Sequence, residues 1–170
     1  MRASVKRRTA AGVLGALYAV LTLLLSPISY GAVQFRLSEA LCVFAFFDPL
    51  YAAGLFAGCL IANLIGSGLI LDIVFGSLAT LGAGLCMAAL GRHGRGWGRC
   101  IAACAMPVVF NAVVIGAVLA ASLVTREAFW ASFALFGAQV GVGELVVMAL
   151  LGLPLLRFVM KRPVFQPYID

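Results

Sequence analysis

Long apolar runs occupy most of this chain of 170 residues, and they constrain its fold more than any other feature. Hydrophobic residues make up 64% of the sequence and charged residues only 11%, which is less than half of the ~25% typical of soluble domains. Too few polar side chains remain to cover a water-facing surface. We therefore expect an integral membrane protein that forms a single domain over residues 1–170.

Four apolar runs can be read directly, at about 10–29, 37–66, 69–91 and 100–123, and a fifth follows at 129–158. A helix needs ~20 residues to cross the hydrocarbon core. The run 37–66 is therefore too long for one comfortable crossing and short for two. The first run is about as long as a full span, so we expect it to be retained rather than cleaved as a signal peptide.

Clusters of basic residues between these runs decide how often 37–66 crosses. Short basic clusters of this kind set membrane orientation rather than bind nucleic acid, and the positive-inside rule assigns them to the cytoplasm. An even number of crossings must then separate the N-terminus from the loop at 91–99, so 37–66 crosses twice. Its turn is expected at Asp48-Pro49, because proline disfavours helical geometry in the residue before it. The clusters hold ten of the twelve basic residues: Arg2, Lys6, Arg7, Arg8; Arg92, Arg95, Arg99; Arg157, Lys161, Arg162.

The predicted fold is an all-α bundle of six membrane-spanning helices in which both termini are cytoplasmic. The expected spans are 10–29, 37–47, 50–66, 69–91, 100–123 and 129–158. The second helix is short, with about 11 residues and a length of ~17 Å at the α-helical rise. The loops 30–36, 66–71 and 124–128 then lie outside, with Glu39, Asp72 and Glu127 at or near the outer surface.

Glu144 lies about halfway down the last span, where an ionised side chain costs roughly 2.5–3.5 kcal/mol on insertion scales. Gly137 and Gly141 share its helical face and leave space beside the acid. One interpretation is tight helix packing through small residues, with Glu144 bonded to a neighbour such as Asn111 in the fifth span. Because Glu144 is deep and set among glycines, we favour a ligand role, with Asn111 and Gln139 as amide contacts.

The first outer loop offers a second group of polar side chains. Arg36 and Glu39 are three residues apart and can pair on a helical turn. Together with Gln34 and Phe35, however, they also offer hydrogen bonds, stacking and charge to a flat polar ligand, and we favour that role.

Two further polar residues lie near the outer ends of spans. Asp72 opens the fourth span, and both a ligand role and a carboxylate stabilised by the helix macrodipole are open for it. Asn63, near the outer end of the third span, can serve a ligand or helix packing.

Small residues recur along the first span: Ala11, Gly15 and Ala19 at spacings of four, with Gly12 and Ala16 beside them. Such spacing lets another helix approach closely, either within the bundle or from a partner protein.

The sequence carries no sign of a metal site, a cofactor or an enzyme. His93, the single histidine, lies in a basic loop, and no CxxC pair exists, so we read the cysteines as small buried hydrophobes. HExxH, GxSxG and P-loop motifs are absent, so the chain does not hydrolyse ATP by itself. The cysteines, which all lie in or beside apolar runs, are Cys42, Cys59, Cys86, Cys100 and Cys104.

Three stretches of the chain resemble the QueT family of substrate-binding S components of energy-coupling-factor (ECF) vitamin transporters. They are VQFRLSEAL at 33–41, the Phe47-Asp48-Pro49 turn with GLFAGCLIANL at 54–64, and DIVFGSLATL at 72–81. The resemblance covers most of the chain. It implies a subunit of the cytoplasmic membrane that takes up a queuosine precursor, such as the deazapurine 7-aminomethyl-7-deazaguanine (preQ1) or queuine.

The resemblance also implies partners, namely a membrane-embedded coupling protein and two cytoplasmic ATPases, and a toppling motion that carries the site inward. In related S components an Ala-xxx-Ala surface on the first helix meets the coupling protein. Here that surface falls on Ala11, Gly15 and Ala19 or on Gly12 and Ala16, where the glycines depart from the alanine pattern.

The polar residues suit such a ligand. A guanine-like edge presents an N–H and an amino group side by side, which one carboxylate can accept in a bidentate manner. The aminomethyl cation calls for a second acid, and the ring faces call for aromatic side chains. We predict that Glu144 and Glu39 do most of the recognition. The full predicted binding set is Glu144, Glu39, Arg36, Asp72, Asn111, Asn63, Gln139, Gln34, Phe35 and Trp130.

Two other transport functions stay open at this point. One is an S component for another small vitamin. The other is a self-sufficient secondary transporter whose buried acids move protons, although no inverted repeat is recognisable. No nucleophile–base pair suggests an intramembrane enzyme, and a purely structural role leaves Glu144 unexplained.

Overall fold

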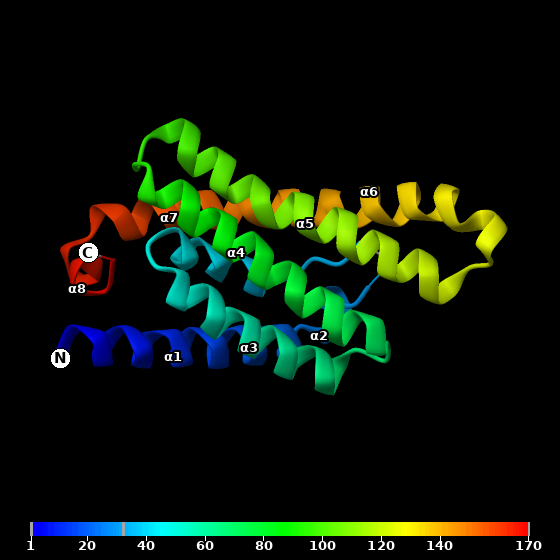
Figure 1. The fold of residues 1–170 in the computed structure, drawn as a ribbon, viewed down its shortest axis with the longest axis horizontal. Coiled ribbons are helices and arrows are strands. Elements are labelled where there is room, and N and C mark those ends of the chain that lie inside the picture. Colours follow the sequence, from blue (N-terminus) through cyan, green and yellow to red (C-terminus); the bar gives the residue numbers. More distant parts are fainter. Residues whose placement is uncertain (1, 32, 170) are drawn as a thin grey trace.

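The computed structural model describes residues 2–31 and 33–169, and all regular structure within them is helical. Most of the helices run roughly along one long axis (Figure 1). Five helical stretches of the described chain are long and apolar enough to cross a membrane: Val5–Leu24, Pro49–Gly66, Asp72–Arg92, Trp97–Leu123 and Arg126–Lys161. The predicted all-helical class with several apolar spans is confirmed, whereas the count of six crossings stays a prediction.

The elements follow the predicted runs closely. In chain order they are α1 (Arg2–Leu24), α2 (Ser26–Ser29), the 3₁₀ helix η1 (Leu37–Phe46), α3 (Pro49–Gly66), the π-helical turn η2 (Asp72–Gly76), α4 (Ser77–Arg92), α5 (Trp97–Leu123), η3 (Arg126–Ala128), α6 (Phe129–Val147), a second π-helical turn η4 (Met148–Gly152), α7 (Leu153–Lys161), η5 (Pro163–Phe165) and α8 (Gln166–Ile169). The run 10–29 is interrupted at Leu25, and Pro27 lies in the first turn of α2. The run 129–158 is nearly continuous, because η4 joins α6 to α7.

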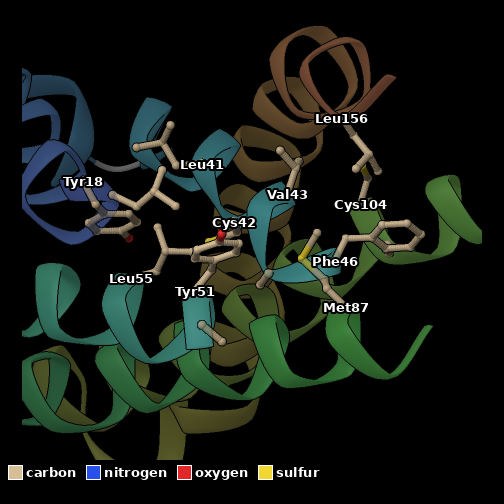
Figure 2. Packing of buried hydrophobic residues seen from close by; sticks show 14 of the residues in the cluster. Tyr18, Leu41, Cys42, Val43, Phe46, Tyr51, Leu55, Met87, Cys104 and Leu156 are labelled. Atoms are coloured by element: carbon tan, nitrogen blue, oxygen red, sulfur yellow. The ribbon is translucent and has the colours of Figure 1, made fainter. Parts of the chain in front are cut away.

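The short second segment, η1, is a 3₁₀ helix rather than an α-helix and lies at the centre of the bundle. Its 10 residues span ~20 Å at the 3₁₀ rise, somewhat more than the ~17 Å expected from the α-helical rise. It packs against α1, α3, α4 and several later elements. Cys42, Val43 and Phe46 of η1 therefore lie in the hydrophobic core together with Leu55 and Met87 (Figure 2).

The predicted turn at Asp48-Pro49 is confirmed. The Asp48 carboxylate caps α3 by accepting a hydrogen bond from the backbone N–H of Leu50 (2.8 Å). Pro49 occupies the first helical position, where a missing N–H has no cost. Asp48 also forms a salt bridge with Arg7 (3.2 Å), which ties the beginning of α1 to this turn.

Helices α1 and α3 pack backbone against backbone through glycines. A Cβ added to Gly15 would overlap the carbonyl oxygen of Gly54, and one added to Gly58 would overlap that of Gly15. Ala11 and Ala19 are buried beside this contact. The face Ala11–Gly15–Ala19 thus serves packing within the bundle, whereas Gly12 and Ala16 lie on the exposed face of α1.

Both termini and the α4–α5 connection lie at one end of the molecule (Figure 1). The connection between α5 and α6 lies at the other end. The basic clusters around residues 6–8, 92–99 and 157–162 are therefore gathered at a single end of the molecule.

Candidate functional site

Polar side chains are concentrated inside the bundle between α1, η1, η2, α5 and α6. Among the described residues four charged side chains are buried, and Glu39 (0% exposed) and Glu144 (1%) are the most completely enclosed. Because charges are rarely buried without partners, each must be accounted for. The buried polar members of the predicted binding set are Gln34, Arg36, Glu39, Asn63, Asp72, Asn111 and Glu144.

Glu39 is surrounded by donors from three other positions. The Tyr18 hydroxyl donates to Oε1, Thr80 Oγ1 donates to the same oxygen (3.1 Å), and Cys42 Sγ donates to Oε2 (3.0 Å). The first turn of η1 places this acid in the centre of the bundle, where α1 and α4 reach it. Glu39 is therefore held by the protein itself on both oxygens.

Arg36 pairs with Asp72 and not with Glu39. The distance from Arg36 Nη2 to Asp72 Oδ2 is 3.3 Å, and Nε donates to the backbone oxygen of Ser29 (3.4 Å). Burial disfavours the guanidinium charge, but the Asp72 carboxylate together with Tyr18, Cys59 and Glu39 outweighs burial, so the pKa of Arg36 lies above its ordinary value. The loop 33–36 is thereby linked to the π-helical turn η2, a type of helix irregularity that is frequent at functional sites.

Asn63 and Tyr30 extend this pair. The Tyr30 hydroxyl lies 2.9 Å from the backbone oxygen of Ala62 and 3.2 Å from Asn63 Oδ1, and its ring lies beneath the Arg36 guanidinium. Burial raises the pKa of Tyr30 to about 12, so its phenol is a neutral donor. Asn63 Nδ2 donates to the backbone oxygen of Asp72 (3.2 Å). Both ends of the Asn63 amide therefore have hydrogen-bond partners within the protein, in Tyr30 and Asp72.

Glu144 bonds to Asn111, as one interpretation of the sequence anticipated: Asn111 Nδ2 donates to Glu144 Oε1 (2.8 Å). Two buried acceptors beside this network, Asn111 Oδ1 and Asp72 Oδ1, have no hydrogen-bond partner within the described chain. Unpaired buried polar atoms are rare in folded proteins and call for an explanation. Both atoms are suited to accept hydrogen bonds from a bound molecule.

The charges of the site do not balance by themselves. Glu144 and Glu39 lie close enough for their charges to interact, and Arg36 acts on both. Within the described residues Arg36 is the one buried cation facing three buried carboxylates, and it is already paired with Asp72. Buried carboxyl groups and unpaired acceptors of this kind can bind groups that bring a positive charge or N–H donors.

The loop 33–36 packs over α6 next to Glu144. A Cβ on Gly143 would overlap the backbone oxygen of Val33 and would lie 3.0 Å from that of Gln34. Gln34 itself is buried and has a φ of 42°, in the left-handed region. Glycine at 143 is what allows the loop backbone to approach the helix this closely.

Three predicted binding residues are not gathered at this network. Gln139 and Phe35 are partly exposed. Trp130 is 76% exposed and packs with Phe129 and Phe133 at the end of the molecule where α5 meets α6.

Sequence reasoning missed Tyr18, Thr80 and Cys42, which hold Glu39. A signal for the first was present, because Tyr18 and Thr22 are polar residues four apart in an otherwise apolar run and share a helical face. A signal for Thr80 was also present, because it follows Asp72 by eight residues, about two helical turns, in the continuous helical stretch Asp72–Arg92.

The sequence profile of the QueT transporter family matches residues 8–161 of the chain. The Queuosine precursor transporter QueT of Lactococcus lactis subsp. cremoris (strain MG1363) is 44% identical over 71 residues, which are 41% of this chain and 41% of that protein. The similarity thus spans less than half the length of this relative. No solved structure matches the chain. Since the family profile extends over all the long helices, the chain belongs to the QueT transporter family.

Proposed function

We propose that this chain is the substrate-binding subunit, or S component, of an ECF-type importer for a queuosine precursor. The family assignment and the name of the Lactococcus relative, a queuosine precursor transporter, support this substrate class. The observation that supports a binding site most directly is the buried Glu144–Asn111 pair. The Asn111 oxygen has no hydrogen-bond partner within the described chain, and a second buried acid, Glu39, lies nearby.

The ligand's two ends suit different parts of this site. The N–H and amino group of a 7-deazaguanine edge match the carboxylate of Glu144, with Asn111 Oδ1 accepting a further hydrogen bond. The cationic aminomethyl group of preQ1 or the amine of queuine would neutralise a second carboxylate, Glu39, or would donate a hydrogen bond to the unpaired oxygen of Asp72. Glu39 already has three protein donors, so Glu144 is the acid with more capacity to bind ligand.

The proposed orientation places both termini and the basic α4–α5 loop in the cytoplasm and loop 30–36 outside. In this orientation η1 counts as the second of six crossings of the cytoplasmic membrane. The site then lies under an outer loop, on the side from which an importer captures its substrate.

The proposed partners are a coupling membrane protein and two cytoplasmic ATPases. Gly12 and Ala16 on the exposed face of α1 are the small residues available to a partner helix, since Gly15 is covered by α3. This restricts the proposed partner face to one of the two stripes that the sequence offered.

Mass spectrometry of the ligand released from purified protein tests the substrate class. A 7-deazaguanine supports the proposal, whereas a different vitamin assigns the chain to another S-component specificity. Substrate uptake by the chain alone in liposomes, without ATPase subunits, would replace the ECF mechanism by secondary transport.

The site itself is tested by Glu144→Gln, which keeps the shape of the side chain and removes its charge. We expect high-affinity binding of preQ1 in isothermal titration calorimetry to be lost, by about 10- to 100-fold or more, with the melting temperature retained. Glu127→Gln, a change at an exposed acid of the α5–α6 loop, is the matched control and should bind like the parent chain. Unchanged affinity of Glu144→Gln would refute the assignment.

A further inference from the structure

Two cavities meet on the α5 surface, away from the buried acids. The first, about 480 Å³, is lined by Thr125, Arg126 and Trp130, among others. The second, about 340 Å³, is lined by Leu71, Phe75 and α5 residues. Both cavities are lined by Ala121, so the two are neighbours along the helix.

The α5 residues that line one or the other cavity lie on one face of the helix. Val113, Ala117 and Ala121 are spaced by four residues and continue into Val124 and Thr125, and such spacing aligns side chains along a helix. The cavities therefore form one trough with a floor of small side chains. From Val113 to Leu123, where α5 ends, its length is ~15 Å at the α-helical rise.

The chemistry of the trough changes from one end to the other. The Val113 end is walled by Leu71 and Phe75, which are apolar and partly open to the surroundings. The other end has the guanidinium of Arg126, the hydroxyl of Thr125 and the exposed ring of Trp130. Tryptophan is enriched where lipid headgroups meet the hydrocarbon core. The exposed acid next in sequence, Glu127, does not line the trough.

We propose that this trough binds one phospholipid with an anionic headgroup, its phosphate on Arg126 and one acyl chain along α5 toward Val113. Guanidinium groups bind phosphate with paired, charge-assisted hydrogen bonds. The length of the trough matches one acyl chain, since half of a hydrocarbon core measures ~15 Å. The site depends only on the location of the chain in a membrane and not on the identity of the transported molecule.

The two tryptophans of the chain allow a direct test, because Trp97 begins α5 and Trp130 begins α6 at the far end. Trp97→Phe leaves Trp130 as the reporter. The protein is placed in nanodiscs of phosphatidylcholine that contain a minor fraction of phosphatidylglycerol with bromine in the upper acyl chains, which quenches nearby tryptophan fluorescence. We expect quenching to correspond to about fivefold enrichment over the bulk lipid fraction, as one arginine at a membrane surface provides.

Two variants in the Trp97→Phe background identify the site. Arg126→Gln should remove the enrichment, and Ala117→Leu, which fills the floor of the trough, should reduce it. Equal quenching by brominated phosphatidylcholine, or enrichment that survives both variants, would overturn the proposal.

Discussion

At the scale of single residues, the site is defined by which polar atoms are already used. Glu39 accepts from Tyr18, Thr80 and Cys42, whereas the Glu144 side chain accepts from Asn111. Arg36 and Asp72 neutralise each other and fasten the outer loop to η2. The buried acids therefore differ in how many of their oxygens the protein already uses.

Replacing one partner of the Arg36–Asp72 pair should destabilise the protein more than replacing both. Arg36→Gln leaves Asp72 as an uncompensated buried charge, and loss of one partner of a buried pair costs about 3–5 kcal/mol. We expect a clear drop in the melting temperature of the detergent-solubilised single variant. The double variant Arg36→Gln/Asp72→Asn should recover part of that loss. If the double variant is as unstable as the sum of the single variants, the two residues do not interact as described.

At the scale of elements, the central contact is the glycine-mediated packing of α1 on α3. Backbone atoms of Gly15, Gly54 and Gly58 touch, so the two helices form one rigid pair that leaves no space for a side chain. The small residues of α1 thus fall into two groups. Ala11, Gly15 and Ala19 lie on the face packed against α3, and Gly12 and Ala16 lie on the exposed face.

Gly58→Ala should destabilise the protein by about 1–3 kcal/mol, because the added methyl group overlaps the Gly15 carbonyl and pushes the helices apart. Gly12→Ala is the matched control, since no atom lies within 4 Å of a Cβ at that position. Thermal unfolding followed by loss of the monodisperse peak in size-exclusion chromatography measures both. Equal melting temperatures for the two variants would contradict the close contact.

The elements also show where sequence reasoning succeeds and where it fails. Hydropathy and charge clusters were enough for the long helices and the Asp48-Pro49 turn, since both depend on local composition. The 3₁₀ geometry of η1 was not predictable, because it results from enclosure by helices distant in sequence. The Glu144–Asn111 bond was one of two interpretations of the sequence. The pairing of Arg36 with Asp72 and the Tyr18–Glu39 bond were not predicted, because each joins elements distant in sequence.

At the scale of the whole molecule, charge is segregated along the long axis. The N-terminus, the α4–α5 connection and the C-terminus lie at one end (Figure 1), and this end carries most of the basic residues. The buried acids lie between the helices beneath loop 33–36, which is part of the connection from α2 to η1. The proposed import direction follows from this polarity.

Labelling of introduced cysteines with a membrane-impermeant maleimide tests that orientation. Thr125→Cys should react in intact cells, and Gly96→Cys should react only after the cells are opened. Both positions are exposed, and the native cysteines are buried or partly buried, so the parent chain serves as the control. The reverse pattern of labelling would invert the proposed orientation.

The backbone contact between loop 33–36 and Gly143 has a consequence for the speed of ligand capture. Main-chain oxygens, not a rotatable side chain, rest on α6 beside Glu144. We therefore expect ligand entry to need movement of the loop as a segment, which is slower than rotation of one side chain. Observed association rates in stopped-flow experiments should therefore level off with rising ligand concentration. Gly143→Ala, which forces the loop away from the helix, should raise that plateau, and a strictly linear dependence in the parent chain would show that the entrance is already open.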